Sequence, residues 1–434
     1  MRGAVVGGLT FLLALTAGAR AVEPGATIDA KTVEQVKDLL PPEIYAHFQK
    51  GEYTNQLVDF PDSRWQWDDG FEEATKWNAE HLVLDEHKAP VDKATGNRPD
   101  YIRGLPFPNI DPNDPDAGYK ALWNMDYAYY AGGNSHNWTE LNWVSRRAVD
   151  RSSTQDVYFL YYDGQPRQYS PPQNPQNLLF QFLAVTASPA DLQGTASLGY
   201  RFKDPTKRDL SWAYVPALRR IRAVSPANRS DGFLGSDQSQ DDGFFFDGKP
   251  EDFEWKVVGH KEGLRFVDGD SIAGKVKRRG LPSGGWRTDA YNNDRTVGYM
   301  VKDWKGLAWA PVVASLAKRR FWVLQGVPKD KYYLYGKLEL WIDDHTWQGA
   351  WNRKFSWQGE LLNVYQVTGV ATVPFNEHER WWGSTFGLQL SENVKQDRAT
   401  ASGMNGPGND PANDRRITLE PRFFDYQTLN RFGK

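Results

Sequence analysis

"RRFWVLQGVPKDKYYLYGKLELWIDDHTWQG", residues 319–349, contains the clearest strand pattern of the chain. In residues 337–343, Leu338, Leu340 and Ile342 alternate with charged residues, which is the period-two pattern of a half-buried β-strand. Trp341 shares the charged, outward face, so we expect a partner or a covering loop on that side. Similar runs of aromatic and β-branched residues recur from residue 154 onward, bounded by Gly, Pro and Asp, and predict an antiparallel sheet.

The rest of the chain divides into three regions. Residues 1–21 have the charged start, apolar run and Ala19-Arg20-Ala21 ending of a cleavable signal peptide. Residues 22–150 predict a helical and loop-rich segment that packs on the sheet, with two short helices in residues 29–48, one that begins at Asp68 or Asp69, and one over about residues 117–131. Residues 151–434 predict the sheet with long loop insertions. We expect residues 399–414 to form an exposed loop before a last strand at about residues 416–419.

The signal peptide and the lack of cysteine predict an exported protein. We expect it in the periplasm of a Gram-negative bacterium, free or associated with the outer membrane. No segment after the leader is long enough to cross a membrane.

Charge and composition narrow the kind of ligand. The formal net charge of −3 argues against nucleic acid, which requires a strongly basic face. The 18 Trp, 20 Tyr and 22 Phe residues favour strands and can line apolar or carbohydrate-binding pockets.

No motif in the sequence predicts catalysis, a metal or a cofactor. His345 and His378 are isolated, and the chain has no G-x-S-x-G or phosphate-binding loop. An acidic run could attract calcium or could be a solvated, turn-rich loop; its members are Asp237, Asp241, Asp242 and Asp247. We therefore expect a protein that is not an enzyme.

An arginine cluster follows the aromatic strand that contains Trp212 and Tyr214. Such a cluster can be ordinary solvated charge at a strand end, can pair with internal carboxylates such as those of "SQDDG", or can form a cationic rim that binds phosphate or carboxylate headgroups. The predicted ligand-binding residues are Trp212, Tyr214, Arg219, Arg220, Arg222, Trp322 and Trp341.

Two stretches carry a family resemblance. "LSWAYVPALRRIRAVSPANRSDG" (residues 210–232) and "SQDDGFFFDGKPEDFEWKVVGHKE" (residues 239–262) resemble the signature of an exported bacterial family, the domain-of-unknown-function family 1329. Residues 319–349 are similar to the family's C-terminal pattern through Trp322, Val323, Ile342, Asp343, Thr346 and Trp347.

The resemblance implies a mainly β (α+β) fold like that of the LolA/LolB lipoprotein carriers. That fold is a strongly curved antiparallel sheet, an unclosed half-barrel, with helices and loops packed in its concavity. Carriers of this kind hold acyl chains in the concavity and keep the headgroup near the rim. Family members often occur beside outer-membrane barrels and exporters of the resistance-nodulation-division type, so the resemblance also implies a part in envelope transport.

The sequence therefore predicts a periplasmic carrier or envelope-assembly factor that binds a hydrophobic or amphiphilic, lipid-like small molecule for transport to or from the outer membrane. An outer-membrane barrel or an exporter is a candidate partner. Two alternatives remain: a secreted carbohydrate-binding or polysaccharide-active β protein, and a structural partner of an outer-membrane complex.

Overall fold

The computed structural model describes residues 22–272, 274–282, 284–289, 296–370, 387–404 and 413–433. Within these residues, 18 strands belong to one sheet and β3 pairs with β4 in a separate small sheet. The main sheet is an antiparallel run in the order β10-β9-β8-β7-β6-β5-β19-β18-β17-β16-β15-β14-β11. The predicted mainly β fold is confirmed.

The strands of this run have the following bounds. Those from the first half of the chain are β5 (Ser135–Ser145), β6 (Val149–Tyr161), β7 (Leu178–Ser188), β8 (Ala196–Phe202), β9 (Leu210–Val215) and β10 (Arg220–Val224). Those from the second half are β11 (Phe253–Asp268), β14 (Ala314–Pro328), β15 (Lys337–Asp343), β16 (Gly349–Phe355), β17 (Leu361–Val367), β18 (Gln389–Asn393) and β19 (Arg398–Met404).

Shorter strands extend the sheet at its margins. They are β1 (Thr27–Ile28), β2 (Asn55–Val58), β12 (Lys277–Gly280), β13 (Trp286–Asp289) and β20 (Asn413–Arg415), and the small separate sheet consists of β3 (Leu82–Leu84) and β4 (Pro90–Asp92). β2 pairs with β14 in parallel, so the sheet is mixed there. β20 pairs with β5 and β13.

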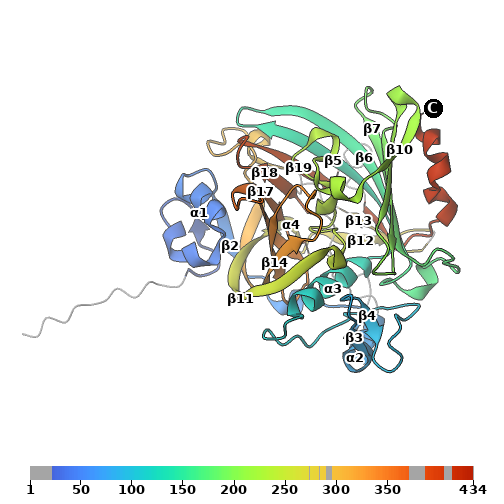
Figure 1. The fold of residues 1–434 in the computed structure, drawn as a ribbon. Helices are drawn as coiled ribbons and strands as arrows, with labels where there is room; N and C mark the ends of the chain where they lie inside the picture. The colour runs from blue at the N-terminus through green and yellow to red at the C-terminus, as the bar shows by residue number, and fades with distance from the viewer. Residues whose placement is uncertain are drawn as a thin grey trace, which may run out of the picture.

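The sheet is strongly curved and does not close (Figure 1). Among the described strands, the end strands of the run, β10 and β11, are not paired with each other. Register shifts occur between β5 and β6, β6 and β7, β7 and β8, β11 and β14, β15 and β16, and β16 and β17. Each such bulge bends its strand and increases the local twist, which accounts for the curvature.

The concave side of the sheet holds the largest hydrophobic core. Helix α3 (Ala117–Tyr130) lies there, and all its residues except Lys120 are buried. Tyr129 and Tyr130 of this helix belong to the same cluster as Phe159 of β6 and Leu340 of β15. A helix that is buried on nearly every side needs this apolar composition, because it has no solvated face.

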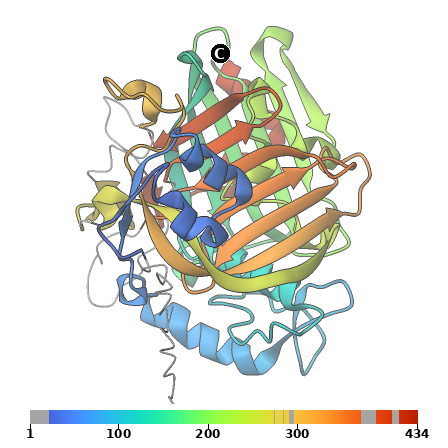
Figure 2. The same ribbon diagram turned by 90° about the vertical axis from the view of Figure 1, so that its left-hand side faces the viewer.

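The outer side of β14–β18 is covered by the N-terminal segment (Figure 2). This segment includes η1 (Val33–Leu39) and α1 (Pro42–Gln49), and Ile44 and Phe48 share a buried cluster with Trp341. Trp341 is therefore covered on its outward face, by η1 and α1 rather than by the expected loop, while Leu338, Leu340 and Ile342 face the concave core.

The outer side of β7–β9 is covered by the other end of the chain. Phe424 of η11 (Pro421–Phe424) and Leu429 of η12 (Tyr426–Gly433) lie in a cluster with Leu198 and Tyr214. Both ends of the described chain thus pack on the convex surface, and the concave side is filled by α3 and the loop before β11.

The predicted helices are confirmed in place. η1 and α1 lie within residues 29–49, and α3 begins at Ala117. Asp68 is the N-cap of α2 (Asp69–His81), and its carboxylate accepts a hydrogen bond from the Phe71 amide. A short helix, α4 (Gly269–Ile272), follows β11. None of the described helices is long and apolar enough to cross a membrane.

Two expectations about strand positions were wrong. β5 begins at Ser135, before the expected start of the sheet, because its polar residues, such as Asn137 and Asn142, are buried and masked the pattern. The expected loop at residues 399–414 contains β19, in which Ala399 and Ala401 are buried, and the last strand is β20 rather than residues 416–419. Residues 405–412 lie outside the described residues.

Candidate functional site

A cavity of about 130 Å³ lies on the concave face of the sheet, between strands β5–β8, β18 and β19 and the loop before β11. Its apolar wall consists of Leu141, Val157, Phe159, Phe182 and Ala184. A volume of this size holds roughly a benzene ring or a short apolar segment. The cavity can therefore take part of a hydrophobic molecule.

Polar groups line the opposite side of this cavity. The Gln238 amide donates a hydrogen bond to Gln389 Oε1 (2.8 Å), and Ser402 Oγ donates one to Gln238 Oε1 (2.9 Å). Gln155 is 5% exposed, and its Nε2 has no hydrogen-bond partner among the described residues. The site thus combines an apolar wall with two amide donors, Gln155 Nε2 and Gln240 Nε2, that lack a hydrogen-bond partner among the described residues.

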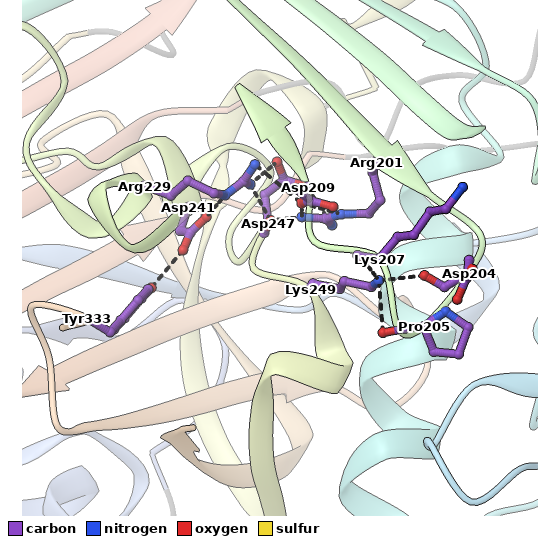
Figure 3. A network of polar contacts seen from close by, with 10 residues as sticks. All are labelled: Arg201, Asp204, Pro205, Lys207, Asp209, Arg229, Asp241, Asp247, Lys249 and Tyr333. Atoms are coloured by element: carbon purple, nitrogen blue, oxygen red, sulfur yellow. Dashed lines mark hydrogen bonds and ion pairs between the residues drawn. The ribbon is translucent and has the colours of Figure 1, made fainter. Parts of the chain in front are cut away.

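The loop that closes the cavity is held by a buried ion-pair network (Figure 3). Asp247, which lines the cavity, lies 3.3 Å from Arg201 Nη1 and 3.1 Å from Arg229 Nη2. Arg201 also binds Asp209 (2.8 Å), and Arg229 binds Asp241 (2.6 Å). Two arginines are therefore shared among three carboxylates, and this arrangement ties the loop to β8 and to the residues before β9.

Further contacts extend the network along the loop. Tyr333 donates a hydrogen bond to Asp241 (2.8 Å). Lys249 Nζ donates to the backbone carbonyls of Asp204 (2.8 Å), Pro205 (3.2 Å) and Lys207 (2.7 Å), as Figure 3 also shows. Because a buried ammonium must be hydrogen-bonded, Lys249 fixes the hairpin between β8 and β9 against the loop.

Burial and charge oppose each other in this network. Burial alone raises the pKa of the Asp209 carboxyl, but the guanidinium groups of Arg201 and Arg229 outweigh it, so the pKa of Asp209 is lowered. Among the described residues, no arginine forms an ion pair with Glu251. Burial raises its pKa from 4.5 to about 7, although Lys249 and Arg98 oppose the rise.

The acidic run is neither a solvated loop nor an arrangement of calcium ligands. All four aspartates are buried, and each has a cationic partner: Arg398 for Asp237, Arg229 for Asp241, Lys354 for Asp242, and both Arg201 and Arg229 for Asp247. Within the described ranges, no group of three or more His, Cys, Asp or Glu residues is placed to hold a metal ion. His345 lies beside the Asp62 carbonyl, and His378 falls outside the described residues.

The predicted ligand-binding residues do not form one site. Trp212 and Tyr214 lie on the outer face of β9, where Trp212 stacks on Tyr426 of η12 (centroids 5.1 Å apart). Trp322 is buried in the concave core and Trp341 in the outer cluster. The aromatic residues that do line the cavity, Phe159, Phe182 and Phe233, were not among those predicted.

The arginine cluster is exposed at the edge of the sheet. Arg219 has a φ of 49° in the turn after η4 (Pro216–Leu218), and Arg220 and Arg222 belong to β10. Among the described residues no ion pair of these three arginines is found. The arginine that pairs with internal carboxylates is Arg229, further along the same stretch. The sequence could have indicated this pairing, because Arg229 precedes a run of aspartates and buried aspartates need cationic partners.

The chain belongs to the family described as protein of unknown function DUF1329, whose model matches residues 27–430. It is 24% identical over 409 residues to the uncharacterized protein PA3922 of Pseudomonas aeruginosa, covering 88% of this chain and 78% of that protein.

Two solved structures are similar at low identity. A DUF1329 family protein from Desulfovibrio piger matches with a TM-score of 0.48 and 14% identity, over 74% of this chain and all of that one. A LolA superfamily protein from Nitrosomonas europaea matches with a TM-score of 0.39 and 10% identity, over 69% of this chain and 95% of that one.

Proposed function

We propose that this protein is a periplasmic carrier, without enzymatic activity, that holds a hydrophobic or amphiphilic small molecule on the concave face of its sheet. The observation that carries the proposal is the cavity, in which an apolar wall of β5–β7 faces polar side chains of the closing loop. Ligand sites combine an apolar lining with a few polar groups in this way. The predicted signal peptide supports a place in the periplasm, and an outer-membrane barrel or exporter is the proposed partner.

The ion-pair network supports a binding role for the loop. Loops position functional groups when a rigid scaffold holds them, and here two buried arginines fix the residues that close the cavity. Burial of an apolar chain contributes about 0.8 kcal/mol per methylene, so a few methylenes in the cavity give useful affinity without chemistry.

A pair of variants on one strand tests the proposal. Ala184 lines the cavity, whereas Ala187, three residues further along β7, is exposed and is not part of the cavity lining. Ala184→Phe adds a ring of about the cavity's size, so we expect it to abolish binding of a fluorescent apolar probe, while Ala187→Phe binds like the wild type. Equal binding by both variants would contradict the proposed site.

Native mass spectrometry of protein purified from an envelope fraction provides a second test. Lipid-sized adducts that are lost in Ala184→Phe support the carrier. A protein free of adducts that binds glycans on an array is instead a carbohydrate-binding protein. One that co-purifies with an outer-membrane complex, without either ligand, is a structural partner.

A further inference from the structure

Two exposed arginines project from the same face of the sheet as the cavity. Ala184 and Ser197, which both line the cavity, are opposite each other on β7 and β8. Ser197 is opposite Ala213, and Ala213 is opposite Arg222 on β10. Directly opposed residues of antiparallel strands project to the same face, so Arg222 is on the concave side. Arg220, two residues earlier on the same strand, shares that side.

The row from the cavity to these arginines is short and contains small side chains. Three strand spacings of about 4.8 Å separate Ala184 from Arg222, or roughly 14 Å between the two backbones. Ser197 and Ala213 are the intervening residues, and Ala213 is half-buried. The concave surface of β8 and β9 therefore leads from the apolar wall to the edge strand without a bulky side chain in this row.

Arg220 and Arg222 differ from the buried arginines of the protein. The guanidinium groups of Arg201 and Arg229 each form ion pairs with two or more aspartates. Arg220 and Arg222 are exposed, and no ion pair involves them among the described residues. Ile221, between them, faces the outer cluster and packs there, which fixes the orientation of the strand.

The cavity itself offers an unsatisfied donor. Gln155 lines it, and its buried Nε2 has no hydrogen-bond partner in the described part of the chain. A buried amide without an acceptor is unfavourable, so the wall is suited to an occupant that brings an oxygen atom.

We propose that Arg220 and Arg222 bind the carboxylate or phosphate headgroup of an anionic amphiphile whose apolar chain lies in the cavity. This inference rests on the proposed function and adds the ligand's charge to it. Arginine matches both headgroups because its forked donors bind two oxygens at once. Arg219 takes no part, because it lies in the turn and outside the row that leads from the cavity.

The competing explanation is protection of an edge strand. Charged residues on an edge strand discourage pairing with other chains, and β10 is such a strand. This role needs charge but no particular ligand, so the two explanations predict different binding results.

The experiment compares four probes on the mature chain: dodecanoate, dodecyl phosphate, the neutral 1-dodecanol and inorganic phosphate. Binding is measured by displacement of a fluorescent apolar probe and by calorimetry. We expect the Arg220→Gln/Arg222→Gln double variant to lose about tenfold or more in affinity for the preferred anionic amphiphile. Its affinity for dodecanol should stay within about twofold of the wild type, and Arg219→Gln should match the wild type for every probe. The stronger of the two anionic probes identifies the headgroup.

Each of the other outcomes contradicts one part of the proposal. Unchanged anionic binding in the double variant leaves only edge protection, and an equal loss in Arg219→Gln shows unspecific attraction. If inorganic phosphate binds as tightly as dodecyl phosphate, the arginines bind phosphate alone and the apolar chain contributes nothing. If none of the three amphiphiles binds the wild type, the proposed function itself fails. If all three bind equally, the carrier stands and the headgroup site fails.

Discussion

Replacement of Arg229 by Met breaks the buried network at its most connected point. Arg229 is 5% exposed and lies 2.6 Å from Asp241, 3.1 Å from Asp247 and 3.5 Å from Asp209. Without it, Asp209 and Asp247 share Arg201, and Asp241 keeps the Tyr333 hydroxyl but has no cationic partner among the described residues. Leaving a buried charge without its partner costs about 3–5 kcal/mol, so we expect the free energy of unfolding to fall by that amount.

The matched control is an exposed ion pair of similar geometry. Arg208 Nη2 lies 2.8 Å from Asp330, but the Arg208 side chain is 61% exposed. Such pairs contribute about 0–1 kcal/mol, so Arg208→Met should lower the free energy of unfolding by no more than this. Urea unfolding followed by tryptophan fluorescence gives both values. If the free energies of unfolding of Arg229→Met and Arg208→Met differ by less than about 1 kcal/mol, the buried network does not stabilise the fold more than an exposed ion pair does.

Three further predictions concern other parts of the chain. Because burial raises the pKa of Glu251 from 4.5 to about 7, the folded chain binds an extra proton in this range, and stability should fall by up to about 3 kcal/mol as pH rises from 4.5 to 7. Glu251→Gln should remove this fall in urea unfolding at pH 5 and pH 8, and an unchanged difference would contradict the assignment. Trp212→Ala should lower the free energy of unfolding by about 2 kcal/mol and increase proteolysis of the C-terminal segment, because Trp212 stacks on Tyr426. Probe binding should be unchanged, since Trp212 does not line the cavity, and a loss of binding would place Trp212 in the site. Gly164→Ala adds a Cβ 2.2 Å from the Tyr130 Cβ at a φ of +83°, whereas Gly25→Ala, at a φ of +97°, meets nothing within 4 Å. We expect Gly164→Ala to be about 1–3 kcal/mol less stable than Gly25→Ala in thermal unfolding, and equal stability would refute the steric argument.

The fold could be predicted where local pattern and burial agree. The alternation in residues 337–343 correctly predicted the position of β15, and the apolar residues from Ala117 correctly predicted α3. β19 escaped prediction because its small and hydroxyl side chains, such as Ala399 and Thr400, resemble a loop. They are buried only because β5 and β18 lie on either side.

The candidate site was harder to predict because it depends on which face of a strand is concave. Alternation shows that Trp212 and Tyr214 share a face, but not that η12 covers that face. Two partners of the acidic run lie far away in the sequence, Lys354 from Asp242 and Arg398 from Asp237, so spacing could not reveal them.

The pairing of β5 with β19 has a consequence for how the chain is made. Arg398 is opposite Ser145, so the junction between the two halves of the sheet joins strands that are synthesised far apart in time. Until β19 emerges, the edge of β5 remains without its neighbour, and an open edge is a template for aggregation. Contacts of such long sequence separation also form slowly. A chain truncated before residue 398 should therefore aggregate rather than fold.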